Sequence, residues 1–132
     1  MTKITKGSCN CSGVKWEAEG ELRPIIMCHC GQCRKQTGSY YAASNVADEK
    51  LKIKDDGTLK WYQSSPVAKR GFCSECGSAL FWKHEGDDFT SLLVGAIDGP
   101  TGLEIAEHIF TQDMPDWYDI TDGKPVRPGD ND

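Results

Sequence analysis

The sequence has no long hydrophobic stretch and no recognisable leader. Apolar runs such as residues 79–82 and 92–94 are only a few residues long, whereas a helix needs about 20 apolar residues to cross a bilayer. The first residues, MTKITKGSCNCSG, contain no apolar segment of the kind found in signal peptides. We therefore expect no membrane partner and a cytoplasmic location.

Positive charge is also scarce. The chain has 15 lysines and arginines against 20 aspartates and glutamates, which gives a formal net charge of −5. The lysines are scattered, and over residues 48–56 they lie among acidic side chains. Proteins that bind nucleic acids usually carry a basic excess or a dense basic stripe. The charge pattern therefore argues against nucleic acid as a partner.

The size and composition of the chain predict a single domain over residues 1–132. Hydrophobic residues make up 38% and charged residues 27%, a mixture too apolar for a disordered protein. A chain of this length buries roughly two-thirds of its surface on folding. The tail at residues 124–132 contains two prolines and two aspartates. We expect this tail and residues 1–6 to be flexible ends.

The seven cysteines carry the strongest signal. They occur as C-x-C, C-x-C-x-x-C and C-x-x-C motifs. An odd number cannot pair completely within one chain, and a disulfide framework is not expected without a secretory leader. Cysteines so close in sequence are poorly placed to bridge one another, but they can direct several sulfurs at one metal ion. Thiolates favour Zn²⁺ or an iron–sulfur cluster over hard cations.

The spacing divides the seven ligands into four and three. A structural zinc uses four ligands, usually as two pairs, whereas a catalytic zinc uses three protein ligands and keeps one position open. The central motif gives the predicted catalytic site: Cys28, Cys30 and Cys33. The outer pairs give the predicted structural site: Cys9, Cys11, Cys73 and Cys76. A less favoured division joins the first two central cysteines to the last pair and leaves three cysteines scattered.

Three other interpretations of the cysteines remain open. A C-x-x-C pair can be a redox motif, which would be expected in a thioredoxin-like βαβ unit, but the sequence around both pairs predicts little helix. An iron–sulfur cluster uses similar ligands, and unligated thiols are the simplest alternative. We favour two Zn²⁺ ions per chain, because the ligand type and spacing fit zinc best.

The remaining sequence predicts β-strands and hairpins. Val14, Trp16 and Ala18 alternate with polar residues, which indicates a half-buried strand. Further expected elements are strands over residues 25–28, 41–46 and 104–110, and hairpins over residues 50–63 and 79–97. The only predicted helix is a short one that follows Cys30 and ends at Gly38. We therefore predict a mainly β fold with little helix.

Five segments carry a resemblance to a known family: GSCNCSGVKW (residues 7–16), CHCGQCRKQTGS (residues 28–39), FCSECGSAL (residues 72–80), HIF (residues 108–110) and PDWY (residues 115–118). Together they resemble the glutathione-dependent formaldehyde-activating enzyme family, with all seven cysteines at matching places. The resemblance implies a small fold of stacked antiparallel sheets that holds two zinc ions. It assigns the outer cysteine pairs to the structural zinc and the central three to the catalytic zinc.

The resemblance also implies an activity. The family's reaction condenses glutathione with formaldehyde to S-hydroxymethylglutathione, and its formal class is carbon–sulfur lyase. The expected partner is therefore a small thiol such as glutathione. The alternative is a non-catalytic, zinc-stabilised domain that binds proteins, in which the central cysteines are empty or closed by a fourth protein ligand.

Substrate-binding residues are predicted beside the central cysteines and near the C-terminus. Three thiolates and one Zn²⁺ leave a net negative charge, so a nearby cation is expected, and Arg34 and Lys35 directly follow the cysteine motif. His108 can be a general acid or base or a hydrogen-bond donor to a ligand, although burial as a hydrogen-bonded core residue is favoured. Trp117 lies in a proline-flanked loop that can line the pocket. His29 lies between two ligands, but strand alternation points it away from them.

Overall fold

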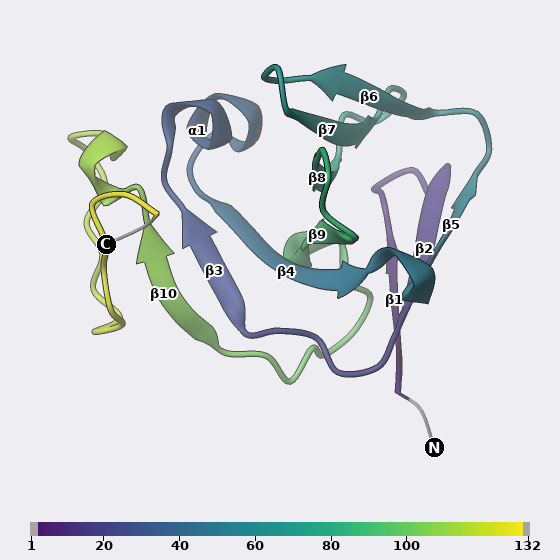
Figure 1. Ribbon diagram of the computed structural model, residues 1–132, viewed down its shortest axis with the longest axis horizontal. Helices are drawn as coiled ribbons and strands as arrows, with labels where there is room; N and C mark the ends of the chain where they lie inside the picture. The colour runs from purple at the N-terminus through teal and green to yellow at the C-terminus, as the bar shows by residue number, and fades with distance from the viewer. Residues whose placement is uncertain (1–2, 131–132) are drawn as a thin grey trace.

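The computed structural model describes residues 3–130, which form ten β-strands, one α-helix and three short 3-10 helices (Figure 1). The strands are β1 (Ile4–Ser8), β2 (Val14–Glu19), β3 (Ile25–Cys28), β4 (Tyr41–Ala47), β5 (Leu51–Asp55), β6 (Leu59–Gln63), β7 (Ala68–Cys73), β8 (Ala79–His84), β9 (Phe89–Leu93) and β10 (Ile105–Ile109). The helices are α1 (Gly31–Thr37), η1 (Asp48–Lys50), η2 (Val94–Ala96) and η3 (Thr111–Asp113). The predicted mainly β fold is therefore confirmed. No helix within residues 3–130 is long and apolar enough to cross a bilayer.

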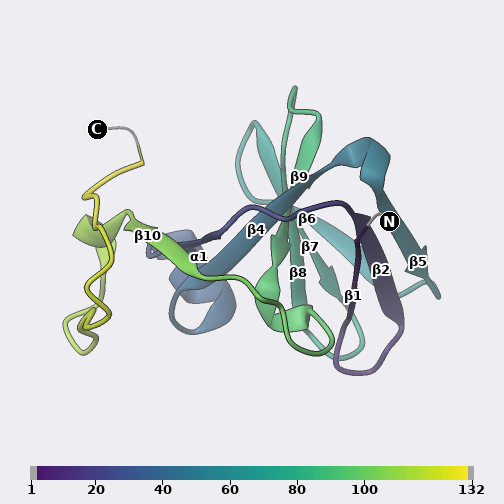
Figure 2. The same ribbon diagram turned by 90° about the horizontal axis from the view of Figure 1, so that it is seen from below.

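The strands form two sheets. The small sheet has the order β1-β2-β5, and the large sheet has the order β10-β3-β4-β9-β8-β7-β6. Pairings between these strands are antiparallel, except that β3 and β10 run parallel. Figure 2 shows the small sheet at one side of the molecule and β10 with the C-terminal segment at the other.

One face of β2 packs into the core of the molecule. Val14, Trp16 and Ala18 are buried and alternate with exposed residues, as the period of two predicts. Gly7 on β1 lies opposite Trp16, and a Cβ atom at Gly7 would lie 2.2 Å from the indole ring. The absence of a side chain at Gly7 therefore allows β1 to pass this close to the ring.

The main hydrophobic core lies between the two sheets. The small sheet contributes Trp16, and the large sheet contributes Leu80 and Phe81, all of them fully or almost fully buried. The buried cysteines Cys9 and Cys73 belong to the same cluster of core residues. The core therefore extends to the place where the outer cysteine pairs were predicted to meet.

The predicted hairpin over residues 50–63 is wrong, although both of its strands exist. β5 pairs with β2 in the small sheet, whereas β6 pairs with β7 in the large sheet. Between them, Asp55 Oδ1 accepts hydrogen bonds from the backbone N–H groups of Gly57, Thr58 and Leu59 at 2.8, 2.9 and 3.0 Å. This turn leads the chain from one sheet to the other. Alternation within a strand indicates its buried face but not its neighbour.

Other local predictions are confirmed. β8 and β9 pair as a hairpin, with Phe81 opposite Leu92, and the helix after Cys30 ends at Gly38, where φ is +92°. No prediction covers β7, because its sequence AKRGFC has two cations and a glycine in place of an apolar alternation.

The ends of the described chain are hydrogen-bonded rather than free. Residues 4–6 belong to β1, and the tail runs beside β10. The N–H of His108 donates to the carbonyl of Pro125, and the N–H of Arg127 donates to the carbonyl of His108, both at 2.9 Å. β10 lies at a sheet edge, and the tail satisfies its free backbone groups there. The flexibility expected of residues 1–6 and 124–132 stays a prediction. Residues 1–2 and 131–132 lie outside the described residues.

Candidate metal centres

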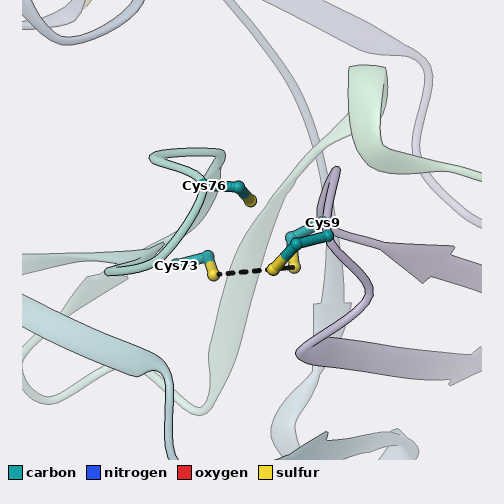
Figure 3. Close-up of side chains that lie close together, drawn as sticks. Cys9, Cys73 and Cys76 are labelled. Atoms are coloured by element: carbon teal, nitrogen blue, oxygen red, sulfur yellow. Dashed lines mark hydrogen bonds between the residues drawn. The ribbon is translucent and has the colours of Figure 1, made fainter.

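The two outer cysteine pairs meet where the two sheets come together. Cys9 and Cys11 lie in the turn between β1 and β2, Cys73 ends β7, and Cys76 lies in the turn that follows. That second turn closes through Gly77, whose φ of +79° favours glycine and whose N–H donates to the carbonyl of Cys73. Figure 3 shows the side chains of Cys9, Cys73 and Cys76 pointing toward one another.

The sulfur separations suit a tetrahedral metal ion. Cys11 Sγ lies 3.7 Å from Cys9 Sγ and 3.6 Å from Cys73 Sγ, and all four sulfurs lie within 4.8 Å of one another. A zinc ion with Zn–S bonds of about 2.3 Å would hold its sulfurs about 3.8 Å apart. These cysteines are free of disulfides, so this four-cysteine cluster can hold a metal ion between the sheets: Cys9, Cys11, Cys73 and Cys76.

The central cysteines form a second cluster, with three sulfurs. Cys28 ends β3, Cys30 is the N-cap of α1, and Cys33 lies in its first turn. The backbone N–H of Cys33 donates to Cys30 Sγ at 3.3 Å, as in a helix cap. The three sulfurs lie within 4.8 Å of one another, and no fourth His, Cys, Asp or Glu of the described chain joins them. This three-cysteine cluster therefore has the ligand number of an open metal site.

Hydrogen bonds among the sulfurs favour a thiolate at Cys30. Those from Cys28 and then Cys33 lower the pKa of Cys30, with smaller contributions from the backbone N–H of Cys33 and the charge of Arg70, while burial opposes them. The same hydrogen bonds raise the pKa of Cys28. A deprotonated sulfur is the form that binds a metal ion, and Cys30 is the sulfur of this cluster whose ionisation the hydrogen bonds favour.

Arg70 supplies the positive charge that was expected beside the three thiolates of this cluster. It is only 5% exposed, and its Nη2 donates to Cys33 Sγ at 3.5 Å, while its Nη1 donates to Gln36 Oε1 at 2.9 Å. Its guanidinium also lies 5.2 Å from the centre of the Tyr41 ring. Sequence reasoning missed Arg70 because it missed β7. The available signal was the position of Arg70 in the sequence, two residues after Ala68 and three before Cys73. Both of these neighbours are buried in the structure.

A cavity of about 480 Å³ lies beside the three-cysteine cluster and is lined by all three of its cysteines. Apolar side chains such as Trp82 and Phe110 form part of its wall, and Arg23, Ser91 and Tyr41 contribute polar groups. Burial raises the pKa of Tyr41, so its phenol is neutral at physiological pH. A largely apolar cavity with a few polar groups is typical of sites for small molecules.

None of the predicted substrate residues lines this cavity. Arg34 and Lys35 are on α1, and neither lines the cavity. Trp117 is 64% exposed and does not line it either. His108 is fully buried. Their roles in substrate binding stay predictions, while the structure places Arg70 and Arg23 at the cavity instead.

Two buried histidines form a hydrogen-bonded chain with an aspartate. His29 Nε2 lies 2.8 Å from His108 Nδ1, and His108 Nε2 lies 2.8 Å from Asp122 Oδ2. With Asp122 ionised, His108 donates to the carboxylate, and its Nδ1 accepts the proton of His29. Burial, and then the charge of His108, lower the pKa of His29. His29 therefore ties the loop between Cys28 and Cys30 to the C-terminal segment and is not in the metal cluster.

The fold and the two clusters define a small, mainly β protein with two groups of cysteines that can each hold a metal ion. The model of the family described as "Glutathione-dependent formaldehyde-activating enzyme" matches residues 4–113. This match spans most of the chain, and the chain belongs to that family.

Two known proteins are similar to this chain. An uncharacterized lyase of Schizosaccharomyces pombe is 26% identical over 116 residues, which are 87% of this chain and 84% of that protein. A crystal structure of a Rhodobacter sphaeroides protein has a TM-score of 0.62 and 24% identity, and the match covers 74% of this chain and 91% of that one. The second likeness shows a shared fold. The family and the first relative support an enzyme of the lyase kind.

Proposed function

We propose that the chain is a zinc-dependent enzyme of the carbon–sulfur lyase type, acting on glutathione or a similar small thiol and its aldehyde adduct. The observation that carries this proposal is the three-cysteine cluster, whose sulfurs converge beside a cavity without a fourth ligand from the described residues. We assign one zinc ion to each cluster, because the donors are thiolates in numbers that suit one closed and one open zinc site.

The open site suits a thiol substrate. Bound zinc would keep a thiol deprotonated at neutral pH. A free thiol with a pKa of about 8.5 is only about 3% ionised at pH 7, so full deprotonation increases the reactive fraction by at most about 30-fold. Enzymes usually accelerate reactions by more than about 10⁶-fold. Positioning of the thiol and the aldehyde in the cavity must therefore contribute most of the acceleration.

The proposed reaction balances without an oxidant or a reductant. The thiol sulfur forms a bond to the aldehyde carbon, the carbonyl π bond breaks, and the thiol proton ends on the new hydroxyl group. Arg70 offsets part of the negative charge that a further thiolate would add beside Cys33. Its guanidinium stays protonated at any physiological pH, so this compensation does not depend on a proton equilibrium.

A reducing compartment follows from the same chemistry. The seven cysteines are free of disulfides, and both clusters need reduced sulfur to bind a metal ion. We therefore propose that the protein works in the cytoplasm, where thiols stay reduced.

Cobalt(II) substitution tests the proposed function. Glutathione should increase the thiolate-to-cobalt charge-transfer absorbance of the fully loaded protein, whereas S-methylglutathione, which has no thiol, should not. Cys30→Ala should remove the response while the absorbance of the four-cysteine cluster remains. Faster formation of S-hydroxymethylglutathione than in buffer, followed by NMR, is the expected catalytic result. If glutathione leaves the charge-transfer absorbance of the wild-type protein unchanged, the proposal is contradicted and a binding domain is favoured.

A further inference from the structure

Arg23 lines the same cavity as the three cysteines, and few of its donors are in use. Its Nη1 donates to the carbonyl of the neighbouring Pro24 at 2.9 Å. None of the ion pairs among the described residues involves Arg23. Arg23 is half-buried and lines the cavity, so a positively charged side chain with several N–H donors borders a space that can hold a ligand.

The nearby carboxylates do not neutralise Arg23. Glu107 is close enough to raise its pKa, but Glu107 Oε1 is bonded to Arg127 Nε at 2.7 Å. Asp130 also lines the cavity, yet it forms no ion pair with Arg23. Burial lowers the pKa of Arg23, although an arginine stays protonated at neutral pH. A partly desolvated charge without a direct ion-pair partner costs free energy that an anionic ligand would recover.

Arg23 differs from Arg70 in the number of guanidinium N–H donors that remain free to bind a ligand. Arg70 is committed to Cys33 and Gln36, so it compensates charge at the metal cluster. Arg23 is held through its backbone instead, because Ser44 Oγ donates to its carbonyl at 2.6 Å and Ser44 is fully buried. The main chain at Arg23 is thus fixed while its guanidinium donors are available.

The position of Arg23 sets the length of a suitable ligand. It lies five residues before Cys28 along the segment that becomes β3, and an extended chain rises about 3.3 Å per residue. The two Cα atoms are therefore at most about 17 Å apart. A molecule of several bonds in length can place one end at the cysteines and the other at Arg23.

We propose that Arg23 is a carboxylate-binding subsite, which makes the preferred substrates small thiols that carry a carboxylate several bonds from the sulfur. This inference rests on the proposed function, because the sulfur end is assigned to the three-cysteine cluster. A guanidinium binds a carboxylate through two parallel N–H···O bonds. Arg23 therefore selects the charged end of the substrate and orients its thiol toward the cysteines.

Calorimetric titration of the zinc-loaded protein tests the subsite. The probes are straight-chain ω-mercaptocarboxylates of three to eight carbons, each compared with its neutral amide. Wild type should bind the acid about tenfold more tightly than the amide at the best chain length. Arg23→Gln should remove this preference and leave the amide affinity unchanged, while Arg23→Lys should keep part of it. The thermal midpoint of each variant checks that it is folded.

Control variants test whether Arg23, rather than another charged residue, causes the preference for the acid. Lys60→Gln removes an exposed charge outside the cavity and should preserve the preference for the acid. The subsite would be refuted if Arg23→Gln still bound the acid more tightly than the amide, or if Arg34→Gln lost this preference instead. Either result would leave the proposed thiol site intact. If wild type binds neither acid nor amide, the thiol site itself fails, and the subsite fails with it. If Asp130→Asn alone creates the preference, Arg23 is already neutralised and the proposal is wrong.

Discussion

Gly7 and Trp16 lie opposite each other on β1 and β2, and the indole fills the space that a larger residue would need at Gly7. A methyl group there would lie 2.2 Å from the ring, and the buried ring has little room to move. Gly7→Ala should therefore lower the free energy of unfolding by about 1–3 kcal/mol. Urea denaturation of the zinc-loaded protein measures this loss.

Gly95→Ala is the matched control for this prediction. A Cβ atom at Gly95 meets nothing within 4 Å, and its φ is outside the left-handed range, so the change should be close to neutral. Equal stabilities of Gly7→Ala and Gly95→Ala would show that β1 does not pack against the indole in this way.

Arg70 contacts Cys33 but none of the four outer cysteines, so its removal should affect one cluster only. Arg70→Gln should keep the fold and weaken zinc binding at the three-cysteine cluster about tenfold, a typical effect for a residue that hydrogen-bonds to a ligand. Competition with a chromophoric chelator measures both sites in the same chain. The four-cysteine cluster serves as the internal reference.

Lys69→Gln is the control for Arg70, since it removes the neighbouring cation on β7. Lys69 Nζ lies 4.5 Å from the centre of the Trp61 ring. The zinc affinities of Lys69→Gln should match those of wild type at both clusters. The role of Arg70 would be refuted by an Arg70→Gln protein that holds its second zinc as tightly as Lys69→Gln does.

The turn after β5 depends on an ionised Asp55. The backbone N–H of Leu59, and then those of Gly57 and Thr58, hold the pKa of Asp55 below its usual value. The folded chain therefore gains stability from this carboxylate above the unfolded pKa of about 3.9, and loses it as the pH falls through the lower folded pKa. Asp55→Asn should be less stable than wild type at pH 7, and the difference should shrink below about pH 4.

Urea titrations of both proteins across this pH range provide the test. The two chains have the same cysteines, so acid effects on metal binding are common to both and cancel in the difference. A difference in stability that stays constant from pH 7 to pH 3 would mean that the Asp55 charge does not hold the turn.

Strands and short motifs are predictable here, whereas their partners are not. The alternation around Trp16 identifies β2, and the hairpin predicted over residues 79–97 is formed by β8 and β9. Pairing depends on contacts distant in sequence, which is why residues 50–63 suggested a hairpin although β5 and β6 lie in different sheets. The parallel pairing of β10 with β3 has the same origin.

The same contrast holds for the candidate sites. The spacing of the cysteines predicts the grouping that the structure shows. Ligands two or three residues apart necessarily lie close together, and the outer pairs were joined because a structural zinc uses four ligands. The need for a cation was also predictable from charge. Its identity was not, because Arg70 is 37 residues from Cys33 in sequence and reaches it only through the folding of β7. Arg34 and Lys35 are near in sequence but not at the cavity.

The two clusters occupy different places in the architecture, which gives them different consequences for stability. The four-cysteine cluster joins the turn between β1 and β2 to the end of β7 and adjoins the main core. Structural zinc contributes about 10–16 kcal/mol of apparent binding free energy, so Cys73→Ala should unfold the domain. The three-cysteine cluster involves β3 and α1 alone, so Cys30→Ala should stay folded. Circular dichroism distinguishes the two outcomes, and unfolding of both variants would contradict the assignment.

The most direct test of the two-site account is the zinc content per chain before and after mild chelation, with a parallel count of reactive thiols. The account predicts two zinc ions, of which one is removed readily as three thiols become reactive, while the domain stays folded. The second zinc should resist until the domain unfolds. Loss of both ions together, or a single tightly held zinc with three thiols reactive from the start, would contradict the assignment of one closed and one open site.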